Sequence, residues 1–391
     1  MFDFDEVIDR HGTSCAKWDD MGPGFGISAE DGLAMWVADM DFRAPQVVND
    51  ALHRLADHGV HGYFGDEKPY KDAIIGWMER RHGWSVAPEQ IATAHGIVAG
   101  LAICLRAYLQ PGDGVILFTP VYHAFAKILK ANGMRIHESP LRLDADGRFQ
   151  MDLEALAASL RGDEKMLVFC SPHNPGGRIW TREELRAVAD FCAERDLLLV
   201  SDEIHHDIVM PGARHIPMPL AAPEHLGRTI MLTAATKVFN IAGGLTGNVI
   251  IPDKGLREKF DIAHRATGTS VNRLGAVMVT AAYSGGDAWC DALCAYLAEN
   301  ARVFKEGVDA LPGVSMMPLE ATYLAWVDFR GTGMEPAELT KRIRKDARIA
   351  ANDGPVFGTG GAGFMRFNLG TQRSRVEEAV GRLQAAFGDL Q

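Results

Sequence analysis

The sequence lacks a long hydrophobic run: no apolar stretch in its 391 residues approaches the roughly 20 residues that a membrane-spanning helix needs. It also lacks a positive charge excess, because 40 lysines and arginines against 51 aspartates and glutamates give a formal net charge of −11. We therefore expect no binding to nucleic acid or to an anionic membrane surface. The opening residues, MFDFDEVIDR, lack the basic and apolar regions of a signal peptide.

Cysteine is scarce, and its placement argues against disulfides and zinc sites. The six cysteines are dispersed, with no C-x-x-C pair and no spacing typical of zinc ligands. Cys104, Cys170 and Cys192 lie in apolar stretches, which favours buried free thiols. Free thiols are typical of a reducing compartment, so we expect a cytoplasmic protein.

Hydrophobic residues make up 47% of the sequence, enough for the sizeable cores of a soluble globular protein. In the middle of the chain, short apolar runs alternate with amphipathic helical stretches. The runs predict buried strands at residues 115–118, 166–170, 197–200, 230–233 and 249–251. Strands separated by helices predict an α/β fold in three layers, with a mainly parallel sheet between two layers of helices.

The pattern changes after about residue 286 and predicts a smaller α+β domain. Its elements are a long helical pattern, two strand-like runs and a last helix, at residues 289–311, 323–329, 364–369 and about 374–387. We expect the N-terminal segment, residues 1–46, to join this domain. Residues 47–285 then form a large domain and residues 286–391 the small one.

Asp202 follows the third predicted strand and begins the stretch Asp-Glu-Ile-His-His-Asp. In a parallel sheet, ligands bind at the carboxyl ends of the strands, so this carboxylate could face a ligand. Taken alone, Asp202 is better interpreted as a helix N-cap. A metal site built from His205, His206 and Asp207 is the weakest interpretation, because adjacent histidines point in different directions.

Lys237 follows the fourth predicted strand, in the stretch Thr-Lys-Val-Phe. Apolar neighbours would desolvate its amine and disfavour the ammonium form, which suits a lysine that forms a Schiff base. A surface lysine is the simpler interpretation when Lys237 is considered alone.

Three further features are individually weak. Asn174 lies between two prolines, which restrict the backbone and aim its side chain. A helix start at about Ile97 would offer free N–H groups to a phosphate. Tyr122 follows a strand, where an aromatic residue is more often ordinary packing.

The order of these features is more informative than any one of them. In this order the chain resembles the fold-type I pyridoxal-phosphate enzymes of the aminotransferase class I/II superfamily. The features that carry the resemblance are a phosphate-type helix start, an aromatic residue, an asparagine between prolines, an aspartate after a strand and a lysine after the next strand. The resemblance covers nearly the whole chain. Three stretches are similar to the cystathionine β-lyases of the MalY/PatB type, also called cysteine-S-conjugate β-lyases: residues 17–19 (KWD), 36–42 (WVADMDF), and 202–205 (DEIH) with 236–243 (TKVFNIAG).

The resemblance implies roles around the ring of a pyridoxal 5′-phosphate cofactor. Lys237 would hold the cofactor covalently and then move the substrate α-proton. Asp202 would pair with the pyridine nitrogen, and this pairing keeps the ring an electron sink. Tyr122 would stack on the ring, while Asn174 and His205 would reach its phenolic oxygen.

The resemblance also implies a phosphate site and a substrate site. The backbone N–H groups of Val98 and Ala99 and the Thr236 hydroxyl would hold the phosphate, with Tyr63 reaching the phosphate of the neighbouring subunit. A homodimer with composite active sites follows. Arg366, together with Asn174, would bind the α-carboxylate of an amino-acid substrate, and the guanidinium would do so bidentately.

The sequence departs from the superfamily pattern at two positions. Leu245 stands where many of these aminotransferases carry an arginine on the phosphate. Arg373 follows Asn-Leu-Gly-Thr-Gln, where relatives often have Cys-Pro before a second arginine, so no role is assigned to it.

The implied activity is cleavage of cystathionine or a related cysteine S-conjugate by β-elimination, which gives a thiol, pyruvate and ammonia. An aminotransferase that transfers the amino group of an L-amino acid to a 2-oxo acid is the alternative, because it would use the same residues. A cofactor-binding sensor fused to a DNA-binding module ranks low. Such a module needs some 60 or more residues, whereas the lyase-like stretch already begins near residue 17.

Overall fold

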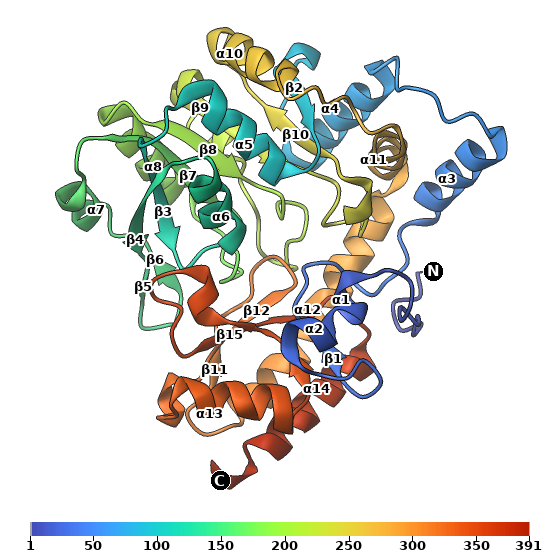
Figure 1. Cartoon of the computed structure of the whole chain (residues 1–391), viewed down its shortest axis with the longest axis vertical. Coiled ribbons are helices and arrows are strands. Elements are labelled where there is room, and N and C mark those ends of the chain that lie inside the picture. The colour runs from blue at the N-terminus through green and yellow to red at the C-terminus, as the bar shows by residue number, and fades with distance from the viewer. Residues whose placement is uncertain (1, 391) are drawn as a thin grey trace.

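The computed structural model describes residues 2–390, and its centre is a seven-stranded sheet (Figure 1). The strands are β2 (Ile91–Ala94), β3 (Gly114–Thr119), β4 (Arg135–Pro140), β7 (Glu164–Cys170), β8 (Leu198–Asp202), β9 (Thr229–Thr233) and β10 (Gly247–Ile250). Their order across the sheet is β2-β10-β9-β8-β7-β3-β4. All five strands predicted from apolar runs are present, and every residue of β3 and β9 is buried, as expected for strands covered on both faces. The predicted α/β fold is confirmed.

Strand β10 is an exception to the predicted parallel pairing. It runs antiparallel to both of its neighbours, β2 and β9. The chain between β9 and β10, residues 234–246, contains turns and one short 3₁₀-helix, Ala242–Gly244, but no α-helix that could cross the sheet. Without a helical crossover the chain returns on the same side and pairs antiparallel.

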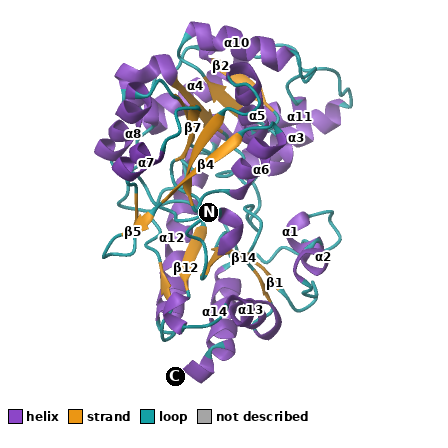
Figure 2. Ribbon diagram, turned by 60° about the vertical axis from the view of Figure 1, so that its left-hand side comes forward, coloured by secondary structure: helices purple, strands orange, loops and turns teal. Residues whose placement is uncertain are grey.

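Helices cover both faces of this sheet, which gives three layers (Figures 1 and 2). One face carries α5, α6 and α10, whose Leu101, Phe125 and Phe260 share a core with the sheet. The other face carries α4, α8 and α11, among others. The bounds are α3 (Gln46–His58), α4 (Lys68–His82), α5 (Ile97–Tyr108), α6 (His123–Ala131), α7 (Leu153–Ser159), α8 (Arg182–Glu194), α9 (Met218–Ala221), α10 (Lys254–Arg265) and α11 (Arg273–Gly285).

A second, smaller sheet follows in the chain, antiparallel and in the order β11-β12-β15-β14. Its strands are β11 (Ser315–Met316), β12 (Leu324–Asp328), β14 (Asn352–Asp353) and β15 (Phe364–Asn368), and its helices are α12 (Asp287–Asp309), α13 (Pro336–Lys341) and α14 (Arg373–Ala386). The N-terminal segment contributes α1 (Ala16–Asp19), α2 (Met21–Phe25) and β1 (Leu33–Ala34), and β1 pairs in parallel with β13 (Ile349–Ala350). A hairpin of β5 (Arg142–Leu143) and β6 (Phe149–Gln150) stands apart from both sheets.

Helix α12 links the two cores. Trp289 and Leu293, in its first half, pack in the core beneath α4 and α11. Phe304 and Val308, in its second half, pack against the small sheet. We therefore propose the division into a large part, residues 47–285, and a small part, residues 286–391 with 1–46, joined by α12. None of the helices in residues 2–390 has the length and apolar character needed to cross a membrane.

Candidate active site

A cavity of about 280 Å³ lies at the carboxyl ends of β8 and β9, beside the start of α5. Seven of the residues predicted from the sequence line it: Val98, Tyr122, Asn174, Asp202, His205, Thr236 and Lys237. They come from segments far apart in the chain, which the strand order β9-β8-β7-β3 brings to one edge of the sheet. Ala38, from the N-terminal segment, closes the cavity on the side of Lys237.

The amine of Lys237 is held against the N-terminal segment. Its Nζ donates a hydrogen bond of 2.6 Å to the backbone oxygen of Ala38, which also accepts one of 2.9 Å from the Tyr323 hydroxyl. Burial lowers the pKa of Lys237 to about 8, although the carboxylates of Asp39 and Asp202 act in the opposite direction. An appreciable fraction of this lysine is therefore neutral near physiological pH, and the neutral form of an amine is the nucleophile.

The carboxylate of Asp202 is 2% exposed and has no charged partner within ion-pair distance in residues 2–390. One oxygen accepts the backbone N–H of Ile204 at 3.1 Å. This is a local turn and no α-helix follows, so the helix N-cap interpretation is wrong. Burial raises the pKa of Asp202 to about 7. A buried carboxylate of this kind is stabilised by a cationic ligand.

His205 and Tyr122 border the same space. The ring of His205 is 2% exposed, and its Nδ1 has no hydrogen-bond partner among the described residues. Burial, together with the positive charges of Lys237 and Arg366, lowers the pKa of His205 well below its usual value, so the ring is neutral. The half-buried Tyr122 has its pKa raised by burial and keeps its hydroxyl protonated.

The start of α5 forms the other end of the cavity. Its N-cap is Gly96 at φ 91°, so no side chain caps the first turn and the N–H groups of Ile97, Val98 and Ala99 are free to bind an anion. Gly247 on β10 permits this arrangement, since a Cβ there would lie 2.7 Å from the Gly96 carbonyl carbon and 2.8 Å from the Ile97 nitrogen. Val98 lines the cavity, whereas Ala99 belongs to the same turn without lining it.

The remaining groups at this end are hydroxyls and imidazole. Thr236 and Thr246 line it, and the buried Thr246 Oγ1 has no partner in residues 2–390. His95 also lines it, while Leu245, 56% exposed and at φ 44°, occupies the position where many aminotransferases have an arginine. No arginine is among the lining residues of this cavity.

Arg366 lies in the middle of β15 and is 2% exposed. Its guanidinium donates to the side-chain oxygens of Asn174 at 3.0 Å and Asn352 at 2.7 Å, and to the backbone oxygen of Trp36 at 2.8 Å. No carboxylate pairs with it and its Nε has no partner in residues 2–390. Burial lowers the pKa of Arg366 to about 10, which still leaves the guanidinium charged. A buried unpaired cation is costly, and an anionic ligand would offset that cost.

The predicted site residue Tyr63 lies elsewhere, and so does Arg373, for which the sequence predicted no role. Tyr63, in the loop between α3 and α4, is 98% exposed and does not line the cavity of its own chain. Arg373 begins α14, where its Nε donates to Asn300 Oδ1 at 2.5 Å and its guanidinium lies over the Tyr296 ring. It is therefore no part of the cavity.

Other residues near the cavity were not predicted from the sequence: Asn352, Tyr323, Thr246 and the backbone oxygen of Ala38. Ala38 lies in the stretch WVADMDF, which was noted only for its resemblance. Asn352 faces Arg366 because the two are partners across β14 and β15. His205 and His206 line different cavities, as expected for adjacent residues.

The aminotransferase class I and II family model matches residues 33–383. The chain belongs to this family. Within it, the chain is 39% identical over 386 residues to the cystathionine β-lyase PatB of Bacillus subtilis, covering 98% of this chain and 99% of PatB. It is 34% identical to the protein MalY of Escherichia coli, covering 98% of each. Among solved structures, the pyridoxal-phosphate-containing cystalysin of Treponema denticola superimposes with a TM-score of 0.95 at 34% identity, covering the whole of both chains.

Proposed function

We propose that the chain is a pyridoxal-phosphate-dependent C–S β-lyase that cleaves cystathionine or a related cysteine S-conjugate to a thiol, pyruvate and ammonia. One observation carries the proposal: a single cavity holds a lysine amine with a lowered pKa and a buried unpaired carboxylate, with an unpaired buried guanidinium beside it. The curated relatives named above support the choice of a lyase within the family.

The cavity fits pyridoxal 5′-phosphate at both ends. Asp202 would pair with the protonated pyridine nitrogen of the cofactor. His205, whose Nδ1 has no hydrogen-bond partner in residues 2–390, and the Asn174 amide would contact the phenolic oxygen of the cofactor. The free N–H groups at the start of α5 and the hydroxyls of Thr236 and Thr246 would hold the phosphate. Tyr122 would stack on the ring face. Borohydride reduction of the holoenzyme is expected to fix the cofactor on Lys237.

When bound, pyridoxal phosphate supplies an electron sink for the pair of electrons left at the substrate Cα. Lys237 would hold the cofactor through Nζ, exchange places with the substrate amine, and then take the proton from Cα. The pKa of about 8 suits this role, because the neutral amine is present near neutral pH. As the electrons from Cα form a bond to Cβ, the C–S bond breaks and the thiolate leaves. The released 2-aminoacrylate reacts with water and yields pyruvate and ammonia.

Arg366 would orient the substrate by binding its α-carboxylate, with Asn174 and Asn352 fixing the guanidinium plane. This single cationic clamp suits substrates whose common feature is an α-amino acid with sulfur on Cβ. The leaving group would extend from the clamp toward the remaining space of the cavity. The site would therefore select the amino-acid part of the substrate more strictly than the thiol that leaves.

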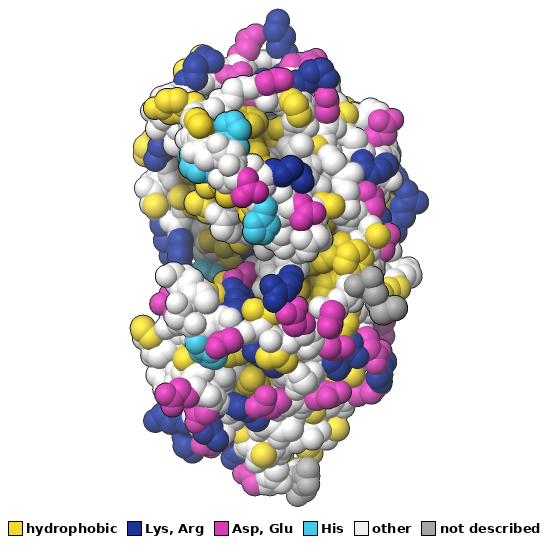
Figure 3. All heavy atoms as spheres, turned by 90° about the vertical axis from the view of Figure 1, so that its right-hand side faces the viewer, with side chains coloured by type: hydrophobic (Ala, Val, Ile, Leu, Met, Phe, Trp, Pro, Cys, Tyr) yellow, Lys and Arg dark blue, Asp and Glu magenta, His cyan; other side chains and the backbone are white. Residues whose placement is uncertain are grey.

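We also propose a homodimer with composite active sites. Tyr63 is almost fully exposed and is accompanied by other exposed apolar side chains, Val60 and Leu274, so this region has the character of an interface. Arg273, at the start of α11, donates to the Val60 oxygen at 2.8 Å and ties the loop to that helix. Figure 3 shows apolar side chains between charged ones on the side of the molecule that carries α3 and α11. Tyr63 would reach the phosphate of the neighbouring subunit and supply a group that Leu245 cannot.

The six free thiols, five of them buried, suit a reducing compartment, and we propose that the enzyme acts in the cytoplasm.

Product analysis tests the proposed activity. The purified enzyme should release pyruvate and ammonia from cystathionine with no 2-oxo acid present, and Lys237→Ala should not. Amino-group transfer to 2-oxoglutarate without pyruvate release would instead identify an aminotransferase.

A further inference from the structure

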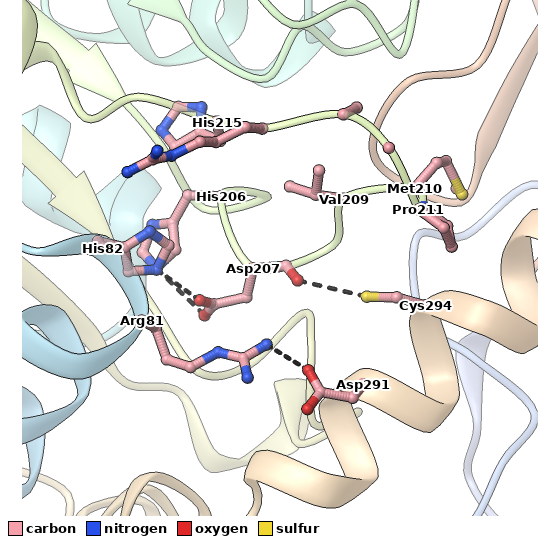
Figure 4. A pocket seen from close by; sticks show the side chains of 13 residues that line it. Arg81, His82, His206, Asp207, Val209, Met210, Pro211, His215, Asp291 and Cys294 are labelled. Atoms are coloured by element: carbon pink, nitrogen blue, oxygen red, sulfur yellow. Dashed lines mark hydrogen bonds and ion pairs between the residues drawn. The ribbon is translucent and has the colours of Figure 1, made fainter.

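A second cavity, of about 310 Å³, is lined by His206, whereas its neighbour His205 lines the active-site cavity. Figure 4 shows this second cavity from close by. His82, at the end of α4, and His206 and Asp207, in the turn after β8, meet at its wall. The side chains of all three are at most 7% exposed. The mechanism proposed above uses none of them.

We propose that His82, His206 and Asp207 form a binding site for a divalent transition-metal ion of the zinc type, separate from the active-site cavity. Each residue offers one ligand atom, and these three atoms all lie within 4.8 Å of one another. His82 Nε2 lies 2.7 Å from Asp207 Oδ1, and His206 Nε2 lies 3.1 Å from Asp207 Oδ2. Ligand atoms around a tetrahedral zinc ion are about 3.3 Å apart. The two His–Asp separations, which go to different oxygens of the carboxylate, are slightly shorter than this value.

His206 provides the observation that favours a ligand over a simple ion pair. It is 1% exposed, and neither of its ring nitrogens makes a hydrogen bond within residues 2–390. Although Nε2 is close to Asp207 Oδ2, the pair is not aligned as a hydrogen bond, and Oδ2 also has no such partner. A buried imidazole without partners is otherwise unfavourable.

The surroundings hold the carboxylate as metal sites commonly do. Trp77 Nε1 donates to Asp207 Oδ1 at 2.9 Å, and the thiol of Cys294 contacts the Asp207 backbone oxygen at 3.5 Å. Such outer contacts orient a ligating carboxylate. Two arginines, Arg81 and Arg214, also line this cavity, and Arg81 is paired with Asp291 at 2.6 Å. Two imidazoles and one carboxylate suit zinc, cobalt or nickel rather than calcium or magnesium, and they leave a coordination position open to water.

His215 lies in the same cavity but is already engaged. Its Nε2 is 2.7 Å from Glu203 Oε2, and its ring stacks on that of His206 at 6.2 Å between centroids. It therefore borders the site without being a ligand. An ion bound by His82 and His206 would link the end of α4 to the turn after β8. This turn begins directly after Asp202 and includes His205.

Metal retention by the holoenzyme tests the site. Wild-type protein is treated with chelator, incubated with Zn²⁺, freed of unbound metal and analysed for zinc per chain, and Co²⁺ is used in parallel for its visible absorption. We expect one ion per chain, with affinity at least tenfold lower in His206→Gln and in His82→Gln. The matched control is His225→Gln, which alters the exposed group of Asp190, Glu224 and His225 and should retain metal like wild type.

The proposal is overturned if the wild-type holoenzyme retains no stoichiometric metal, or if both glutamine variants retain it as wild type does. It is also overturned if His225→Gln is the variant that loses the ion, because the exposed group would then be the site. Should His206→Gln fail to fold, His82→Gln decides alone, because His82 is the ligand contributed by the end of α4. The cofactor is present in all four proteins, so metal bound by its phosphate contributes equally.

Discussion

Two buried ionisable side chains at the candidate active site, Asp202 and Arg366, have no oppositely charged partner within ion-pair distance in residues 2–390. Each is expected to gain one from a ligand, a pyridinium for Asp202 and an α-carboxylate for Arg366. The two residues therefore give the most direct predictions at the scale of single side chains.

The first prediction concerns the pH dependence of stability. Because burial raises the pKa of Asp202 to about 7, the folded apoprotein holds a proton that the unfolded chain releases near its usual pKa of 3.8. Stability from this group is therefore full below about pH 4 and is lost as the pH rises toward 7. We expect the free energy of unfolding to fall by about 4 kcal/mol over this range in wild type, and we expect Asp202→Asn to abolish that fall. Urea unfolding of both apoproteins across this range measures it, and identical pH profiles would contradict it.

The second prediction concerns Arg366→Lys. Lysine keeps the charge but cannot bind a carboxylate bidentately or keep both asparagine contacts, so kcat/KM should fall about 10- to 100-fold, mainly through KM. Arg373→Lys is the matched control, because Arg373 makes the same kind of contacts outside the cavity. Its kcat/KM should stay within about twofold of wild type. Equal losses in the two variants would mean that Arg366 is not the substrate clamp.

Single residues also show where sequence reasoning succeeds and where it ends. Lys237, Asp202 and Asn174 attract notice because each stands beside a strand end or a proline, but only their order along the chain, through the family resemblance, predicted their roles. Asn352 could not, because its contact with Arg366 depends on the pairing of β14 with β15. His82 likewise meets His206 only through packing of α4 on the sheet, so the sequence offered no reason to group them.

At the scale of elements, the start of α5 depends on the close approach of β10. Gly247→Ala would place a Cβ 2.7 Å from the Gly96 carbonyl carbon and must push this helix start outward. Because the free N–H groups there would hold the phosphate, we expect cofactor affinity to fall at least about tenfold. Gly243→Ala is the control, since a Cβ there meets nothing within 4 Å. Titration of the apoproteins with pyridoxal phosphate gives both affinities; unchanged binding in Gly247→Ala would place the phosphate elsewhere.

The elements themselves were predicted well where burial is uniform. β3, β7, β8 and β9 are continuous apolar runs, and such runs identify strands without knowledge of their partners. β4 was not predicted, because it lies at the edge of the sheet and carries charged and polar residues. The antiparallel direction of β10 was missed because direction is decided by the connection before the strand, not by the strand's own composition.

At the scale of the whole molecule, the exposed Tyr63 leads to a complementation experiment. In a dimer with composite sites, mixing Tyr63→Phe chains with Lys237→Ala chains produces dimers with one site that carries both changes and one that carries neither. Activity should then rise above that of either parent after subunit exchange. Sedimentation and mass analysis would establish the exchange itself. No gain in activity despite complete exchange would show that Tyr63 serves no site across the interface.

The central claim, that the enzyme eliminates a thiol from Cβ, is tested most directly by comparing two reactions of the holoenzyme. One is pyruvate release from cystathionine or an S-alkylcysteine without 2-oxo acid, and the other is amino-group transfer from an aromatic or aliphatic amino acid to 2-oxoglutarate. Both require removal of the α-proton, but only a substrate with sulfur on Cβ has a group that can leave. We predict that kcat/KM for elimination exceeds that for transfer. A transfer reaction favoured about 100-fold, or about 2.7 kcal/mol in the transition state, would contradict the account and identify an aminotransferase.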